Sequence, residues 1–170
     1  MDWFMILFRL IHIVSAIAWA GGAALFFFYV EPTVNKLGPD AEKFMNEMFA
    51  RKLPLYFILA SSFAVFGGAV LYVRDAGGVQ VWGGPQGTVI TIGALAAIVA
   101  WVGGNAFIPS TAIKMQGVLA EIRSAGGPPN AELSGRLHAL QERLRRIGMI
   151  DLLLLTVAVV AMETARYWNF

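Results

Sequence analysis

An arginine and a histidine lie three residues apart in an apolar segment near the N-terminus. The segment from Arg9 to Gly22 reads RLIHIVSAIAWAGG, and His12 is one of only two histidines in the chain. Residues three apart share one face of a helix. Ionisable side chains are costly inside a membrane and commonly functional there. An imidazole nitrogen of His12 can ligate haem iron, and Arg9 can pair with a haem propionate.

A second iron ligand would have to lie on the same side of the membrane as His12. Met162 is expected at a matching depth in the last apolar segment, and Met/His ligation suits haem or copper. Glu163, beside it, can neutralise Arg9. His138 is expected on the opposite side, so it is excluded as a partner within one chain. A site with His12 alone, or one shared between subunits, stays open.

Both side chains also have structural interpretations. Arg9 can extend to the lipid headgroups, and His12 can simply hydrogen-bond a neighbouring helix. Two other polar residues are interpreted structurally. Asp151 is expected to complete an ion pair with the arginines at 145–146, and Asn105 is expected to bridge two helices by hydrogen bonding.

The composition indicates a membrane protein. Of the 170 residues, 58% are hydrophobic and 14% are charged, against about 25% charged in a typical soluble domain. Four apolar segments are long enough to span a bilayer, at about 3–30, 53–73, 88–109 and 149–168. We therefore expect an all-α polytopic protein of one domain, 1–170, with four transmembrane helices in an antiparallel bundle. The absence of cysteine excludes disulfides and thiolate metal sites.

The distribution of basic residues predicts the topology. Ten of the 13 Lys and Arg lie in the two segments 31–52 and 110–148. Because cytoplasmic loops are enriched in Lys and Arg, both segments are expected in the cytoplasm. This places both termini outside the cytoplasm, in a cell inner (plasma) membrane. The net charge of +2 gives no support for binding nucleic acid.

The connecting segments carry structure of their own. Residues 39–50 have the pattern of an amphipathic cytoplasmic helix. Residues 111–148 are expected to extend the third and fourth helices into a cytoplasmic hairpin. On the other side, the glycine-rich loop 74–87 carries Trp82 as an interface anchor.

A short pattern occurs twice. Ala-Trp-Ala-Gly-Gly at 18–22 recurs as Ala-Trp-Val-Gly-Gly at 100–104. A two-helix unit used twice in one orientation would be a parallel 2+2 repeat. The alternative is coincidence in segments rich in small residues, since the glycine pairs at 21–22, 67–68 and 103–104 are expected where helices cross closely.

The first segment, RLIHIVSAIAWAGGAALFFFYVEPTV, resembles the first helix of small bacterial four-helix membrane proteins of the copper-resistance D (CopD-like) type. These begin with Leu/Ile-His, Trp-x-Gly-Gly and a later Pro. It is similar, more distantly, to the HemJ-type protoporphyrinogen oxidase, whose first helix has an early histidine associated with haem b. The second half, NAFIPSTAIKM…RLHALQERLRRIGMIDLLLL, resembles uncharacterised four-helix families.

The resemblance implies a four-helix bundle with His12 at the position of the family histidine. The chain departs from the HemJ-like pattern because Lys52-Leu-Pro54 matches its lysine context in helix two only loosely. It also has few Met and His residues at the outer surface for copper handling. Enzymatic activity is therefore not carried over, and no catalytic residue is assigned.

These observations predict a membrane protein that binds haem b or a related tetrapyrrole through His12, with Arg9 and Met162, for electron transfer or redox chemistry. The alternative is a non-enzymatic membrane subunit that acts through helix packing and its cytoplasmic hairpin. Copper or small-solute transport is a third hypothesis. The expected partners are the lipid bilayer and either a second copy of the chain or another membrane protein.

Overall fold

The computed structural model describes residues 2–37, 41–75, 84–126 and 130–168, and within them the chain is helical without strands. Its elements are α1 (Trp3–Leu25), the π-helical η1 (Phe26–Val30), α2 (Glu31–Leu37), α3 (Ala41–Ala50), α4 (Leu53–Asp75), α5 (Pro85–Ser124), α6 (Ala131–Thr164) and the 3-10 turn η4 (Ala165–Tyr167). Four helical stretches are long and apolar enough to cross a membrane: Trp3–Leu37, Leu53–Arg74, Pro85–Ser124 and Ala131–Tyr167. The predicted all-α class and the four candidate spans are confirmed.

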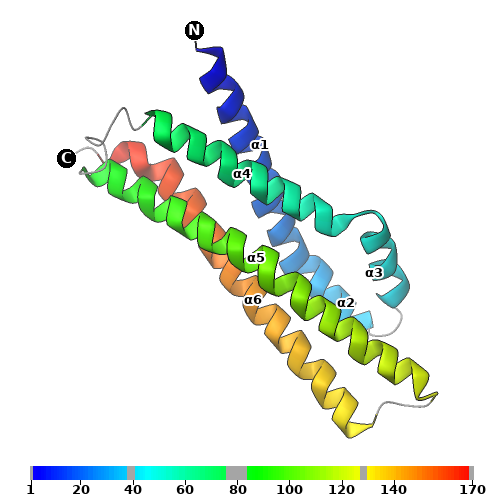
Figure 1. The fold of residues 1–170 in the computed structure, drawn as a ribbon. Coiled ribbons are helices and arrows are strands. Elements are labelled where there is room, and N and C mark those ends of the chain that lie inside the picture. The colour runs from blue at the N-terminus through cyan, green and yellow to red at the C-terminus, as the bar shows by residue number, and fades with distance from the viewer. Residues whose placement is uncertain (1, 38–40, 76–83, 127–129, 169–170) are drawn as a thin grey trace.

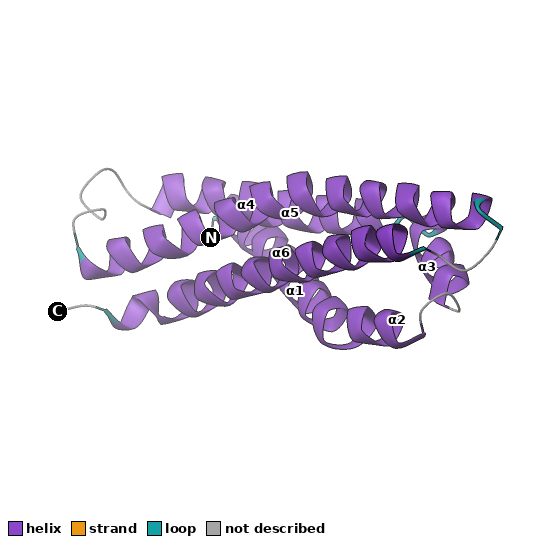
Figure 2. Cartoon of the chain, turned by 90° about the horizontal axis from the view of Figure 1, so that it is seen from below, coloured by secondary structure: helices purple, strands orange, loops and turns teal. Residues whose placement is uncertain are grey.

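The long helices associate as two pairs. Helix α1 packs mainly against α4, and α5 packs along α6, whereas the contacts between the two pairs are fewer (Figure 1). Both chain ends lie at one end of the molecule, which we call the terminal end. The turn between α5 and α6 lies at the other, the hairpin end (Figure 1). Helices α2 and α3 are also at the hairpin end, far from the C-terminus (Figure 2).

The buried core is built mostly from small residues. Its central cluster consists of Trp19, Ala60, Ala64, Ala100 and Leu155. Many large apolar side chains lie on the outside instead, among them Ile17, Phe63, Leu95 and Leu153. This inside-out distribution is what a bilayer permits, since lipid tails are as apolar as leucine and helices associate through small residues.

The first span continues further than the sequence predicts. The predicted segment 3–30 stops before Pro32, but helix α2 carries on to Leu37. The π segment just before the proline explains the difference, because the Glu31 N–H bonds to the Phe26 carbonyl, five residues back. Proline has no N–H and its ring collides with the preceding turn of an α-helix. The wider π turn accommodates the ring without ending the helix.

Of the four glycines in the two repeated motifs, two lie against a neighbouring helix as predicted and two do not. A Cβ at Gly22 would lie 3.2 Å from the rings of Tyr56 and Phe57, and one at Gly104 would lie 3.4 Å from a carboxyl oxygen of Asp151. At Gly21 and Gly103 a Cβ would meet nothing within 4 Å, so the prediction is wrong there. In each of these two motifs only the second glycine faces a neighbouring helix.

Helices α5 and α6 continue past the predicted spans toward the hairpin end. Helix α5 passes through Pro109, and Asn130 caps α6 by accepting the Leu133 N–H at 2.8 Å. Arg136 of α6 pairs with Glu121 of α5 at 2.8 Å. The side of the membrane on which this hairpin lies stays a prediction.

The other two predicted connecting elements are only partly described. Helix α3 covers residues 41–50 of the predicted amphipathic helix, with Ala41 buried and Phe44 exposed. Residues 38–40 lie outside the described residues, as do residues 76–83 with the predicted anchor Trp82.

Candidate functional site around His12

The imidazole of His12 is fixed by a hydrogen bond between helices. Its Nδ1 lies 2.7 Å from the backbone carbonyl oxygen of Ala64 on α4. A carbonyl oxygen only accepts, so Nδ1 carries the proton and donates it. In the neutral ring, Nε2 then holds a lone pair. The described part of the chain offers Nε2 no hydrogen bond.

Two glycines on α4 allow this close approach. A Cβ at Gly67 would lie 3.2 Å from the backbone nitrogen of His12. A Cβ at Gly68 would lie 3.0 Å from Nδ1 of the ring and 2.9 Å from Cε1, and the second distance is shorter than real Cβ contacts. His12 therefore packs directly against Gly67 and Gly68, and a side chain at position 68 would displace the ring.

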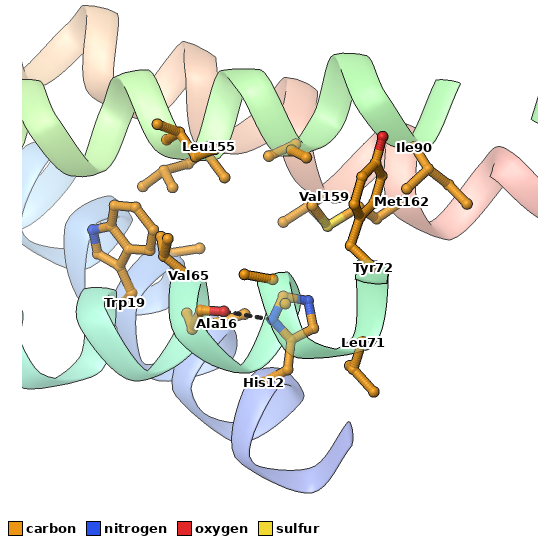
Figure 3. A pocket seen from close by; sticks show the side chains of 18 of the residues that line it. His12, Ala16, Trp19, Val65, Leu71, Tyr72, Ile90, Leu155, Val159 and Met162 are labelled. Carbon is orange, nitrogen blue, oxygen red and sulfur yellow. Dashed lines mark hydrogen bonds between the residues drawn. The ribbon is translucent and has the colours of Figure 1, made fainter. Parts of the chain in front are cut away.

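The His12 ring borders a cavity of about 500 Å³ between the two helix pairs (Figure 3). Its walls are formed mostly by alanine and aliphatic side chains from α1, α4, α5 and α6, with Trp19 near one end and Tyr72 near the other. This volume falls in the range of small-molecule and cofactor sites, and an apolar wall with few polar groups is typical of them.

Met162 lines the same cavity from α6, on the side away from His12 (Figure 3). The structure thus brings together two of the three predicted ligand-binding residues, which lie 150 positions apart in the chain. Arg9 is exposed and does not line the cavity, and Glu163 is exposed next to Met162. The roles of all three predicted residues as cofactor ligands stay predictions. His138 is exposed on the part of α6 toward the hairpin end.

One polar group at the cavity was not singled out from the sequence. The Thr91 hydroxyl donates to the Gly87 carbonyl at 2.7 Å, so the Tyr72 hydroxyl, 2.7 Å from Thr91 Oγ1, is the donor of that contact. Tyr72 and Gln86 both line the cavity. The available signal was a tyrosine at the end of one apolar segment and a threonine near the start of the next.

The prediction for Asn105 is confirmed. Its amide donates to the Ser61 hydroxyl on α4 at 3.3 Å and to the Trp101 carbonyl of its own helix at 2.8 Å. Asn105 therefore bridges α5 and α4.

The predicted ion pair of Asp151 is wrong for the part of the chain that the structure describes. Its side chain is buried, whereas the arginines at 145–146 are exposed. Positions five and six residues apart point to different faces of a helix. Asp151 therefore faces Gly104 of α5, and the arginines face outward.

The fold and the cavity together define a helical protein with four candidate membrane spans and an apolar internal site bordered by one histidine. Comparisons with protein-family models, with curated proteins and with solved structures find no match for this chain. The resemblance to CopD-like and HemJ-like proteins therefore stays a prediction based on short motifs.

Proposed function

We propose that this protein is an integral membrane protein that binds haem b or a related metal tetrapyrrole through His12, for electron transfer or redox chemistry. The observation that carries the proposal is the His12–Ala64 hydrogen bond. Because Nδ1 donates its proton to that carbonyl, the neutral ring has the Nε2 lone pair free, and the ring borders an apolar cavity.

The donor set fits a tetrapyrrole better than a bare metal ion. Histidine ligands in metal sites usually donate their other N–H to a carbonyl or carboxylate, as His12 does to Ala64. A bare ion needs several ligands, and the described residues contain no group of three or more His, Cys, Asp or Glu that could hold one. A tetrapyrrole supplies four nitrogen ligands itself and asks the protein for one or two axial ones.

The side chains around the cavity have distinct roles in this proposal. His12 would hold the iron, and Met162 is the candidate second ligand from α6. The alanine and aliphatic walls pack on the macrocycle and exclude water. When bound, the group would supply reversible one-electron chemistry at iron, with a reduction potential that depends on the side chains that ligate it. Arg9, one turn from His12, is the candidate partner of a propionate at the surface.

The membrane placement is part of the proposal. Large exposed apolar side chains on the four candidate spans support contact with a bilayer. Basic residues concentrate in the segments 31–52 and 110–148, which supports a cytoplasmic location for the hairpin end. We assign the protein to the inner membrane, with both termini outside the cytoplasm.

The absorption spectrum of the detergent-purified protein, supplemented with haem, tests the function. We expect a Soret band that is lost in His12→Ala and retained in His138→Ala, since His138 is exposed and remote from the cavity. A protein that stays colourless after supplementation would overturn the proposal. So would a His12→Ala variant with an unchanged spectrum.

A further inference from the structure

Asp151 is a buried carboxyl group that does not itself line the cavity. Its side chain is 8% exposed, and its Oδ1 is buried without a hydrogen-bond partner among the described residues. The group lies against Gly104, where a Cβ would be 3.4 Å from Oδ1 and 4.0 Å from Oδ2. The missing side chain at position 104 leaves the room that the carboxyl occupies.

No charged side chain lies at the level of Asp151 on the elements around it. The segments 13–30, 53–73 and 85–113 contain no Asp, Glu, Lys, Arg or His, and neither do the remaining residues of 147–162 on α6 itself. The nearest charged residues along these elements are Glu31, Lys52, Lys114 and Arg146. None of them forms an ion pair with Asp151 in the part of the chain that is described.

The nearby polar groups are already engaged. The Asn105 amide bonds to Ser61 and to the Trp101 carbonyl, and the Ser61 hydroxyl donates to the Ile58 carbonyl. Tyrosine hydroxyls do not serve either. Tyr56 donates to the Ala18 carbonyl, and Tyr29 is exposed at the surface.

Burying an unpaired carboxylate costs several kcal/mol even after the surroundings relax, whereas a neutral carboxylic acid costs far less. A metal cation would need several oxygen ligands in place of the missing partner. The described residues provide no second carboxylate and no cluster of metal ligands around Asp151. A single proton is the ligand that one isolated carboxyl can bind.

We propose that Asp151 is a proton-binding site inside the membrane-spanning part of the protein. One carboxyl oxygen holds a proton at neutral pH and gives it up at alkaline pH to hydroxide, which becomes water. Leu155, one turn further along α6, lines the cavity, so Asp151 lies one helical turn from the cavity wall. The assignment does not depend on what the cavity binds.

Infrared spectra of the purified protein at neutral pH test this site. We expect the carbonyl band of a protonated carboxylic acid in the wild type. The band should be lost in Asp151→Asn and kept in Glu163→Gln, which removes an exposed acid of the same helix. A wild-type spectrum without the band, or a band that persists in Asp151→Asn, would overturn the proposal.

Carbodiimide labelling uses only the wild-type protein. It therefore tests the proposal even if the Asp151→Asn variant does not fold. The apolar reagent dicyclohexylcarbodiimide reacts with a protonated carboxyl: the acid oxygen bonds to the central carbon, and the acid proton moves to a nitrogen. We expect an adduct mapped by mass to Asp151 that forms more slowly at alkaline pH. No adduct at Asp151, or an unchanged rate at alkaline pH, contradicts the proposal.

Discussion

The Nδ1 atom of His12 on α1 lies 2.7 Å from the carbonyl oxygen of Ala64 on α4. This contact joins the two helices of one pair and, at the same time, sets the tautomer of the ring. The structural alternative, in which His12 only bonds a neighbouring helix, accounts for Nδ1 alone. It leaves unexplained why Nε2 is left without a protein partner in the described residues and why the ring borders a cavity of about 500 Å³.

Gly68→Ala should weaken both the fold and the site. The new Cβ would lie 2.9 Å from the ring of His12, so the ring or helix α4 must shift. Overpacking of this kind costs about 1–3 kcal/mol. We expect a lower melting temperature in detergent and weaker haem binding. Gly21→Ala is the control, since its Cβ meets nothing within 4 Å, and it should not lower the melting temperature. Equal effects of the two substitutions would contradict the packing of Gly68 against the His12 ring.

Met162→Leu separates a ligand from a packing residue. Exchanging methionine for leucine conserves volume and usually costs less than about 1.5 kcal/mol, so the protein should remain folded. If the sulfur ligates iron, the visible spectrum and the reduction potential of the haem-loaded protein should change. Met149→Leu, at an exposed position of the same helix, should change neither. An unaltered spectrum in Met162→Leu would show that Met162 only lines the cavity.

Asp2 should stabilise the terminal end in two ways. Its Oδ1 accepts the Met5 N–H at 3.3 Å as a helix cap, and its Oδ2 lies 3.3 Å from Nη2 of Arg74. Asp2→Asn keeps a good cap and loses the ion pair, which at this exposure is worth less than about 1 kcal/mol. Asp2→Ala loses both and should cost about 0.5–2 kcal/mol more. Thermal unfolding in low and high salt measures the difference, and only the ion-pair part should shrink with salt.

The topology predicts the behaviour of a reporter fused after Phe170. A reporter that is active only outside the cytoplasm should be active there. One that requires the cytoplasm should be inactive, because we propose that both termini lie on the outer side. The opposite pattern would reverse the orientation of the protein without changing its fold.

The sequence was sufficient to predict where the membrane-spanning helices lie. It was insufficient to predict which face of each helix is buried. Long apolar segments predict spans because a helix in lipid must satisfy its own backbone, whatever its neighbours are. Which side of such a helix is buried does not follow, since lipid-facing and core-facing residues are both apolar. Gly21 and Gly22 illustrate this: the same residue type at adjacent positions faces open space in one case and Tyr56 in the other.

The candidate site was predictable where it contains a residue that is energetically costly to place in a membrane. His12 and Met162 were chosen for chemistry and depth, and the structure places both on one cavity. Asp151 was misjudged because nearby arginines in the sequence suggested a partner, while helical geometry turns them to another face. The role of Tyr72 was missed because its contact with Thr91 depends on how α4 packs against α5.

The most direct test of the central claim is chemical rescue of His12→Ala. The haem-supplemented variant should lack the wild-type Soret band, and added imidazole should restore it by supplying the missing ligand in the cavity. The same imidazole should leave His138→Ala unchanged. A His12→Ala variant that is folded, as judged by its melting curve, but that keeps the band without imidazole would contradict ligation by His12. Failure of imidazole to restore a lost band would contradict it as well.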